Sequence, residues 1–263
     1  MPAIVITTAE DDVRQKREAT ARRVIAEFGH EFPDLRLLCF FDDQDWDPFG
    51  KAFTKANRGF YRPLTAPGFS DPKWPNYVMR QLFVDDPPAW IQKRVFDHVI
   101  YLHGSTCSDE VEMSMTFAHE LRHFEQWAKT PQAYAAGILV LQLLQYWPAE
   151  TAVEVHLTSW ADIPHERDAR IVAKRVVENM FGAERTRDFI DRNIVNPADG
   201  PDEEDWRFIR NIASSDSYDL QRETRRLFQR LAPYKRDCEA VLQERSKHIP
   251  ELKHLDLAKL FNQ

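Results

Sequence analysis

Residues 119–123 read His-Glu-Leu-Arg-His, and their types and spacing indicate metal chemistry. On an α-helix, His119 and His123 lie about 40° apart on one face, one turn from each other. Two imidazoles placed in this way can bind one Zn²⁺ at about 2.0–2.1 Å. Glu120 lies about 100° from His119, where its carboxylate can reach a metal-bound water without itself binding the metal. Glu120 therefore has the position of a general base, although two histidines at this spacing also occur on helix surfaces without metal.

The motif needs a helix, and its neighbours predict one from Asp109 to about Lys129. Ser108 is suited to cap the start, acids follow it in the first turn, and no proline or glycine interrupts the segment. An apolar stripe lies nearly opposite the histidines, so we expect other elements to cover both faces. The stripe consists of Met113, Phe117, Leu121, Phe124 and Ala128, and the histidine face also carries Glu112, Met115 and Gln126.

A strand is expected just before this helix, at Val95–His103, and Gly104-Ser105-Thr106 ends it. The strand, the HExxH helix and an acidic helix downstream resemble the zincin metallopeptidases over roughly residues 95–180, about a third of the chain. The resemblance implies Zn²⁺ as the cofactor. It also implies that an edge strand before the active-site helix, here 98–104, binds an extended peptide by backbone pairing.

Within this resemblance, the third metal ligand distinguishes the subgroups. The metzincin pattern would have Gly at position 126 and His at position 129, whereas this chain has Gln126 and Lys129. The gluzincin type remains, in which a Glu comes from a later helix. Its best match is Glu166, in a helix that begins near Pro164 with Asp162 as a possible cap.

The helical wheel places Glu166 about 60° from Ala169, at the edge of an apolar stripe. Zinc would be a partner for a carboxylate there, because burying an isolated charge is costly. The stripe consists of Ala169, Val172, Ala173, Val176 and Met180. An ordinary first-turn acid is the alternative for Glu166, and Glu150, Glu154 and His165 remain rival ligands. Asp168 and Glu112 are candidate acids that orient the histidines, with plain surface acids as the alternative.

These residues predict a zinc-dependent hydrolase, with His119, His123 and Glu166 as metal ligands and Glu120 as the catalytic base. The expected activity is a peptidase that cleaves a specific peptide or protein. The alternative is a catalytically inactive zincin-fold protein that acts as a metal-binding sensor or as a protein-interaction module. A group that stabilises the oxyanion is not identified, and the candidates by residue type are Tyr134, His156, His165 and Tyr101.

Composition excludes several other classes of protein. The chain has 8 glycines in 263 residues, about 3% against a usual share of about 7%, which disfavours glycine-rich phosphate loops. Its net charge of −7 disfavours nucleic-acid binding, and the arginines in Gln221–Arg230 are interpreted as a solvated helix face. The widely spaced Cys39, Cys107 and Cys238 form no CxxC pair. With no signal peptide and no membrane span in view, a cytoplasmic location is expected.

The expected fold class is α+β and zincin-like, with a small mixed or antiparallel sheet packed on the HExxH helix and a mainly helical C-terminal part. We expect two domains: residues 1–195 as the metallopeptidase domain, and 196–263 as a helical extension that could bind a protein partner. Residues 44–76 read as irregular, with a possible short helix near Pro48–Asn57. Further strands are expected at Leu35–Phe41 and Tyr77–Val84. Further helices are expected at Asp11–Phe28, after Pro131, Pro148 and Pro164, and at Trp206–Ala213, Tyr218–Leu231 and Tyr234–Lys247.

Overall fold

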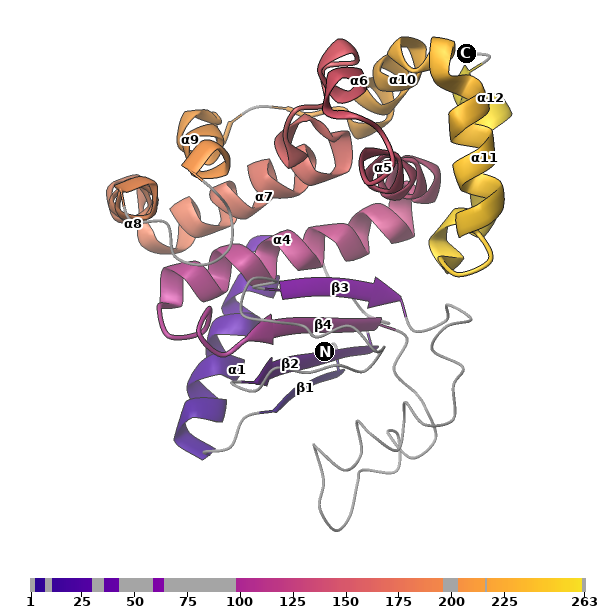
Figure 1. The fold of residues 1–263 in the computed structure, drawn as a ribbon. Coiled ribbons are helices and arrows are strands. Elements are labelled where there is room, and N and C mark those ends of the chain that lie inside the picture. The colour runs from indigo at the N-terminus through magenta and orange to yellow at the C-terminus, as the bar shows by residue number, and fades with distance from the viewer. Residues whose placement is uncertain are drawn as a thin grey trace.

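A computed structural model describes residues 3–7, 11–29, 36–42, 59–63, 98–195, 203–215 and 217–261. The expected strand at Tyr77–Val84 and the short helix near Pro48–Asn57 lie outside these residues. The described chain begins with strands and one helix and continues as a long series of helices (Figure 1). This arrangement confirms the α+β class in its coarse sense.

The strands form a mixed four-stranded sheet in the order β1-β2-β4-β3. β1 (Ala3–Thr7), β2 (Arg36–Asp42) and β4 (His98–His103) are parallel, and β3 (Gly59–Pro63) runs antiparallel to β4. Helix α1 (Asp11–Glu27) connects β1 with β2, as a parallel pair requires. The expected strand at Leu35–Phe41 and the expected helix at Asp11–Phe28 are confirmed to within one residue at each end.

The strand that precedes the HExxH helix is not at the edge of the sheet. β4 pairs with β2 on one side and with β3 on the other, so the expectation that 98–104 is a free edge is wrong. Among the described strands, β3 lies at this end of the sheet, within a region expected to be irregular. Its five residues are too few to show a clear alternation, which explains why the sequence did not reveal it.

Helix α4 (Glu110–Lys129) carries the HExxH motif and is buried on two sides. It packs on β3 and β4 with one face and on α7 (Pro164–Phe181) with another. Figure 1 shows α4 between the sheet and the later helices. On the apolar stripe, Phe117 and Leu121 are fully buried, and on the histidine face Met115 and Gln126 are buried as well. The expected cover on both faces is confirmed, although Ala128 of the stripe is exposed.

The remaining helices pack beyond α4 and α7. Helix α5 (Pro131–Leu144) contacts α4, α7 and the later helices α10 and α11. The others are α6 (Ala149–Glu154), α8 (Ala183–Val195), α9 (Glu203–Asn211), α10 (Leu220–Arg230), α11 (Lys235–Arg245) and α12 (Leu257–Phe261), with 3-10 turns at Trp160–Asp162, Ala232–Tyr234 and Pro250–His254. Among the residues described, no helix combines the length and the apolar character needed to cross a bilayer. A domain boundary at residue 195 stays a prediction.

The N-terminal cap of α4 differs from the expected one by one residue. The side chain of Asp109 accepts hydrogen bonds from the backbone N–H groups of Val111 and Glu112, at 2.8 and 3.1 Å. The hydroxyl of Ser108 instead donates to the carbonyl of Ser105. The expectation that Ser108 caps the helix is therefore wrong, because the chain turns tightly through residues 103–108 and the helix begins only after Asp109.

We expect Asp109→Ala to lower the free energy of unfolding by about 0.5–2 kcal/mol, the usual cost of losing an N-cap. Asp109→Asn should cost less, because an amide oxygen also caps, and Ser108→Ala is the matched control. Urea denaturation of the three variants measures the difference. A loss for Ser108→Ala as large as that for Asp109→Ala would contradict the assignment of the cap.

Candidate metal centre

The two histidines of the motif meet on the face of α4 that packs against α7. Their Nε2 atoms lie 3.0 Å apart, as the i, i+4 spacing of a helix allows. The ring centroids are 4.6 Å apart and the ring planes are nearly perpendicular. Both rings therefore present a nitrogen to the same point in space.

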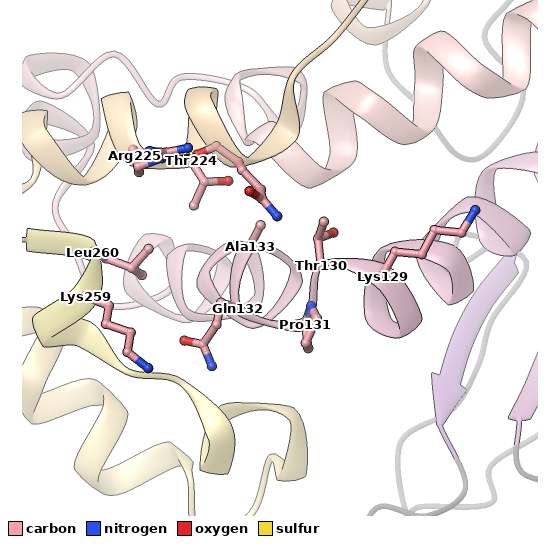
Figure 2. Close-up of a pocket in the computed structure, with 10 residues that line it drawn as sticks. Lys129, Thr130, Pro131, Gln132, Ala133, Thr224, Arg225, Lys259 and Leu260 are labelled. Carbon is pink, nitrogen blue, oxygen red and sulfur yellow. Dashed lines mark hydrogen bonds between the residues drawn. The ribbon is translucent and has the colours of Figure 1, made fainter. Parts of the chain in front are cut away.

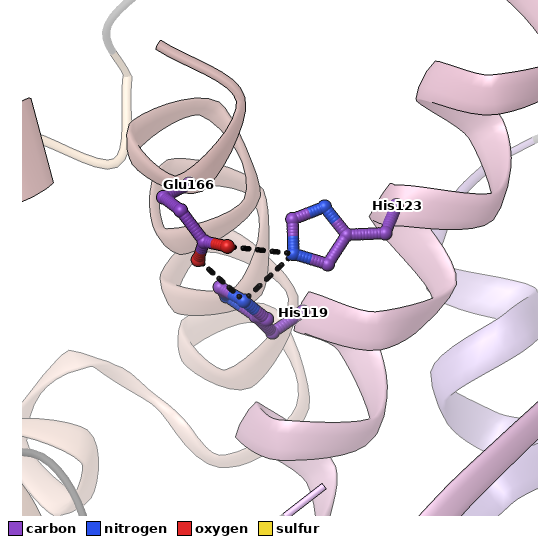
Figure 3. Close-up of side chains that lie close together, drawn as sticks. All are labelled: His119, His123 and Glu166. Carbon is purple, nitrogen blue, oxygen red and sulfur yellow. Dashed lines mark hydrogen bonds and ion pairs between the residues drawn. The ribbon is translucent and has the colours of Figure 1, made fainter. Parts of the chain in front are cut away.

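Glu166 in the first turn of α7 completes the group (Figure 3). Its Oε2 lies 3.1 Å from Nε2 of His119, and its Oε1 lies 3.6 Å from Nε2 of His123. Pro164 occupies the first turn of α7, as expected, and so places Glu166 at the start of a helix that packs closely on α4. The N-cap residue of this helix is Ile163 and not the expected Asp162. Asp162 instead accepts hydrogen bonds from the backbone N–H groups of Thr158 and Ser159.

These three side chains could together hold a metal ion. One ligand atom of each lies within 4.8 Å of the others. The two histidine nitrogens are 3.0 Å apart, and each faces a different oxygen of Glu166, at 3.1 Å for His119 and 3.6 Å for His123.

The electrostatics of the group centre on the buried Glu166 carboxylate. Burial lowers the pKa of His119 to about 4, against the opposing effect of its hydrogen bond to Glu166. Burial also disfavours the charged form of His123, but the negative charge of Glu166 outweighs this and raises the pKa of His123 to about 9. Burial alone would raise the pKa of Glu166, yet charged His123 holds that pKa well below its usual range. The carboxylate thus has a cationic partner, and a metal ion can take the place of the proton.

Two of the three rival ligands lie away from the histidines of the motif, and the third, His165, lies beside Glu166. Glu150 and Glu154 are exposed, and Glu154 accepts a hydrogen bond from the hydroxyl of Tyr234 at 2.6 Å. His165 is buried beside Glu166, with its Nε2 3.4 Å from Oε1 of that residue. Burial lowers the pKa of His165 to about 3, which keeps the ring neutral. Among the candidates from the sequence, the structure brings Glu166 together with both histidines of the motif.

Glu120 occupies the side of α4 that faces β3. Its side chain is buried, and its charge helps to raise the pKa of His123. A Cβ on Gly59 of β3 would lie 3.5 Å from Cγ of Glu120 and 2.9 Å from Cγ2 of Thr116. Only glycine fits here without a shift, so β3 runs directly past the carboxylate expected to act as the base.

The sequence placed Gln126 on the histidine face of α4 but predicted no function for it. Its Oε1 lies 2.9 Å from Nδ1 of His123, and its Nε2 donates to Oδ2 of Asp168 at 2.8 Å. The signal that could have found it is the i, i+3 spacing from His123, which makes the two side chains neighbours on a helix. Asp168 thus reaches His123 through Gln126 rather than directly. The orienting role expected of Glu112, which is half-buried in the first turn of α4, stays a prediction.

The candidates for oxyanion stabilisation differ in their surroundings. Tyr134 is 2% exposed, and its ring centroid lies 5.8 Å from that of His123. Tyr101 is buried in β4 and stacks on Phe60, and His156 is exposed after α6. His165 is the candidate nearest to the metal group, because its ring centroid lies 5.3 Å from that of His123 and its Nε2 lies 3.4 Å from Oε1 of Glu166. The role of each candidate stays a prediction.

A separate cavity of about 410 Å³ lies where α4 ends and α5 begins, between these helices and α10 and α12 (Figure 2). It is lined by Lys129, Thr130, Pro131, Gln132, Ala133, Gln221, Thr224, Arg225, Lys259 and Leu260. Two lysines of the cavity have carboxylate partners. Nζ of Lys129 lies 3.0 Å from Oε1 of Glu125, and Nζ of Lys259 lies 3.4 Å from Oδ2 of Asp256. None of the metal-group residues lines it. The cavity is therefore separate from the His119, His123 and Glu166 group.

We expect Glu166→Gln to bind Zn²⁺ at least about ten-fold more weakly than the unmodified chain, because a neutral amide replaces an anionic ligand. Glu154→Gln is the matched control and should leave the affinity unchanged. Competition with a chromophoric chelator measures both dissociation constants. Weaker binding in the Glu154 variant alone would reassign the third ligand.

Gly137 of α5 lets helix α5 approach α7. A Cβ at this position would overlap the ring of His165. Alanine normally stabilises a helix relative to glycine by about 1 kcal/mol, but here we expect Gly137→Ala to lower the free energy of unfolding by about 1–3 kcal/mol through overpacking.

The control for this prediction is the same change in a His165→Ala background. Removing the ring removes the overlap, so Gly137→Ala should then be neutral or stabilising in urea denaturation. A cost that is equal in the two backgrounds would show that the contact with His165 is not the cause.

Comparison of the chain with models of protein families, with curated proteins and with solved structures finds no match. Its resemblance to zincins therefore rests on the HExxH motif and its setting. The geometry of the His119, His123 and Glu166 group is the observation that a functional proposal has to explain.

Proposed function

We propose that the chain is a zinc-dependent hydrolase, a peptidase of the zincin type with a gluzincin-like third ligand. The observation that carries the proposal is the convergence of His119, His123 and Glu166, whose ligand atoms lie within 4.8 Å of one another. Two of them belong to the HExxH motif and the third comes from a later helix, as the resemblance requires. Glu120 of the same motif supplies the base.

The donor set favours zinc over the common hard cations. Calcium and magnesium prefer sites built from oxygen ligands, whereas this group offers two imidazole nitrogens and one carboxylate. Three protein ligands leave one position of a tetrahedral ion for water or substrate, which is the pattern of catalytic zinc. The side chain of His119 is 18% exposed, compared with 8% for Glu166 and 7% for His123. Water and substrate therefore reach the group most easily beside His119.

The reaction follows from the roles of the side chains. A zinc ion held by His119, His123 and Glu166 would act as a Lewis acid, which activates water and polarises a carbonyl. Glu120 accepts the proton of the attacking water and later donates it to the departing amine. His119, His123 and Glu166 hold the centre in place, and Glu166 contributes the charge that offsets the cation.

An extended peptide is the substrate that the sheet accommodates. Among the described strands, β3 pairs with β4 alone, so its other edge is the one that we propose for a further strand. Peptides add to such edges through backbone hydrogen bonds. Because Gly59 of β3 lies close to Glu120, a peptide paired along β3 passes the base. We therefore propose that β3, and not the strand at 98–104, binds the peptide by backbone pairing.

We expect the purified chain to carry about one zinc ion, as a single catalytic site requires. Glu120→Gln should retain the metal and lose at least about 10²-fold in the rate of peptide cleavage, the usual contribution of a general base. Mass spectrometry of a proteome-derived peptide library measures cleavage, and elemental analysis measures zinc. Glu110→Gln, on the same helix beside Arg23, is the matched control and should remain active.

The outcomes separate the competing interpretations. If the chain takes up no zinc when purified without chelator, the proposal is wrong. If it binds zinc but the library stays intact, the chain is a metal-binding sensor or interaction module rather than a peptidase. Equal cleavage by the Glu120 variant and the unmodified chain would remove Glu120 from the mechanism.

A further inference from the structure

We infer that Gln126 is a positioning residue that couples the metal ligands of two helices, α4 and α7. The inference rests on the proposed metal centre and assigns a role to a side chain outside the HExxH motif. Gln126 is 1% exposed and lies between His123 and the first turn of α7. Its amide contacts both helices at once.

The hydrogen bonds fix which way the amide points. Nε2 of Gln126 donates to the backbone carbonyl of His165 and to Oδ2 of Asp168, both at 2.8 Å. A carbonyl and a carboxylate only accept hydrogen bonds, so the atom facing them has to be the NH₂ group. The carbonyl oxygen Oε1 of Gln126 must then face Nδ1 of His123, at 2.9 Å.

This orientation determines how His123 can bind a metal. Because Oε1 can only accept, Nδ1 of His123 has to carry the proton of that bond. In the neutral ring, Nε2 then carries the lone pair, and it is this atom that faces His119 and Glu166. The partner on one ring nitrogen selects the other nitrogen for the metal, as supporting residues do in metal sites.

The same amide holds the third ligand. The carbonyl of His165 belongs to the peptide unit that leads directly into Glu166. Gln126 thus ties the ring of one ligand to the backbone beside another, across the contact between α4 and α7. A shift of α7 along α4 would break this bond and would also move the Glu166 carboxylate away from the histidines.

Asp168 makes the arrangement rigid. It is 2% exposed, and both of its oxygens meet the guanidinium of Arg122, at 2.8 Å for Nε and 3.3 Å for Nη2. Arg122 in turn donates to Glu125 at 2.8 Å. Gln126 therefore places a neutral amide between an ionised carboxylate and His123. The ring is held by a chain of hydrogen bonds while the metal group gains no further negative charge.

The test compares Zn²⁺ binding by Gln126→Met with that by Gln132→Met. Met keeps the length and volume of Gln126 and removes all three hydrogen bonds. Gln132→Met is the matched control, because it makes the same change on α5, where Gln132 lines the separate cavity and accepts a hydrogen bond from the backbone N–H of Asp256. We expect the dissociation constant for zinc to rise about 10–100-fold in Gln126→Met, the usual effect of losing such a partner. Gln132→Met should stay within about three-fold of the unmodified chain.

A second readout separates positioning from simple packing. The visible absorption of bound Co²⁺ reports the geometry of the ligands, and we expect it to change in Gln126→Met and to stay the same in Gln132→Met. If Gln126→Met does not fold, Gln126→Asn takes its place. It keeps an amide but is one methylene too short to reach His123 and α7 together, so it should also weaken zinc binding.

Three results would overturn the role of Gln126: unchanged zinc affinity in its variants, an unchanged cobalt spectrum, or an equal loss in Gln132→Met. In each of these cases the unmodified chain still binds metal, so the proposed function survives. An unmodified chain that binds no metal would overturn the proposed function and this role together. The metal centre and the role of Gln126 are thereby both tested without measuring activity.

Discussion

A buried carboxylate that faces two imidazoles is the constraint on which the rest of this site depends. Glu166 is only 6% exposed, and an ionised group at that depth is costly unless a positive charge or several donors surround it. His119 and His123 supply the donors from α4, at 3.1 and 3.6 Å. The contact between α4 and α7 therefore has to be held in one register, since a slip would leave the charge without partners.

Several features of the fold serve that register. Helix α4 lies between the sheet and α7, so neither of its faces can rotate without disturbing a core. Arg122, Asp168 and Gln126 form polar links between α4 and α7. On the third side, α5 approaches closely enough that the ring of His165 packs against Gly137. Packing and hydrogen bonding thus act on the same helix contact.

The sheet contributes the other half of the candidate active site. β4 leads into α4 through a tight turn, and β3 adds an antiparallel strand beside it. The close approach of Gly59 to Glu120 brings an edge of the sheet next to the base of the proposed reaction. Glu120 directly follows His119 in the sequence, so the proposed cleavage joins this edge of the sheet to the metal group through the base.

The sequence by itself determined what depends on neighbours along the chain. The spacing of His119 and His123, the position of Glu120 and the helix that carries them follow from the 3.6-residue period, and the periodicity of α7 brought Glu166 to the edge of its buried face. What only the tertiary structure decided was which distant groups meet. Glu150 and Glu166 are both acids in the first turn of a helix, and only the packing of α7 on α4 buries one of them beside the histidines. The same holds for β3 as the outer strand and for the double role of Gln126, because contacts between segments far apart in the chain depend on the whole fold.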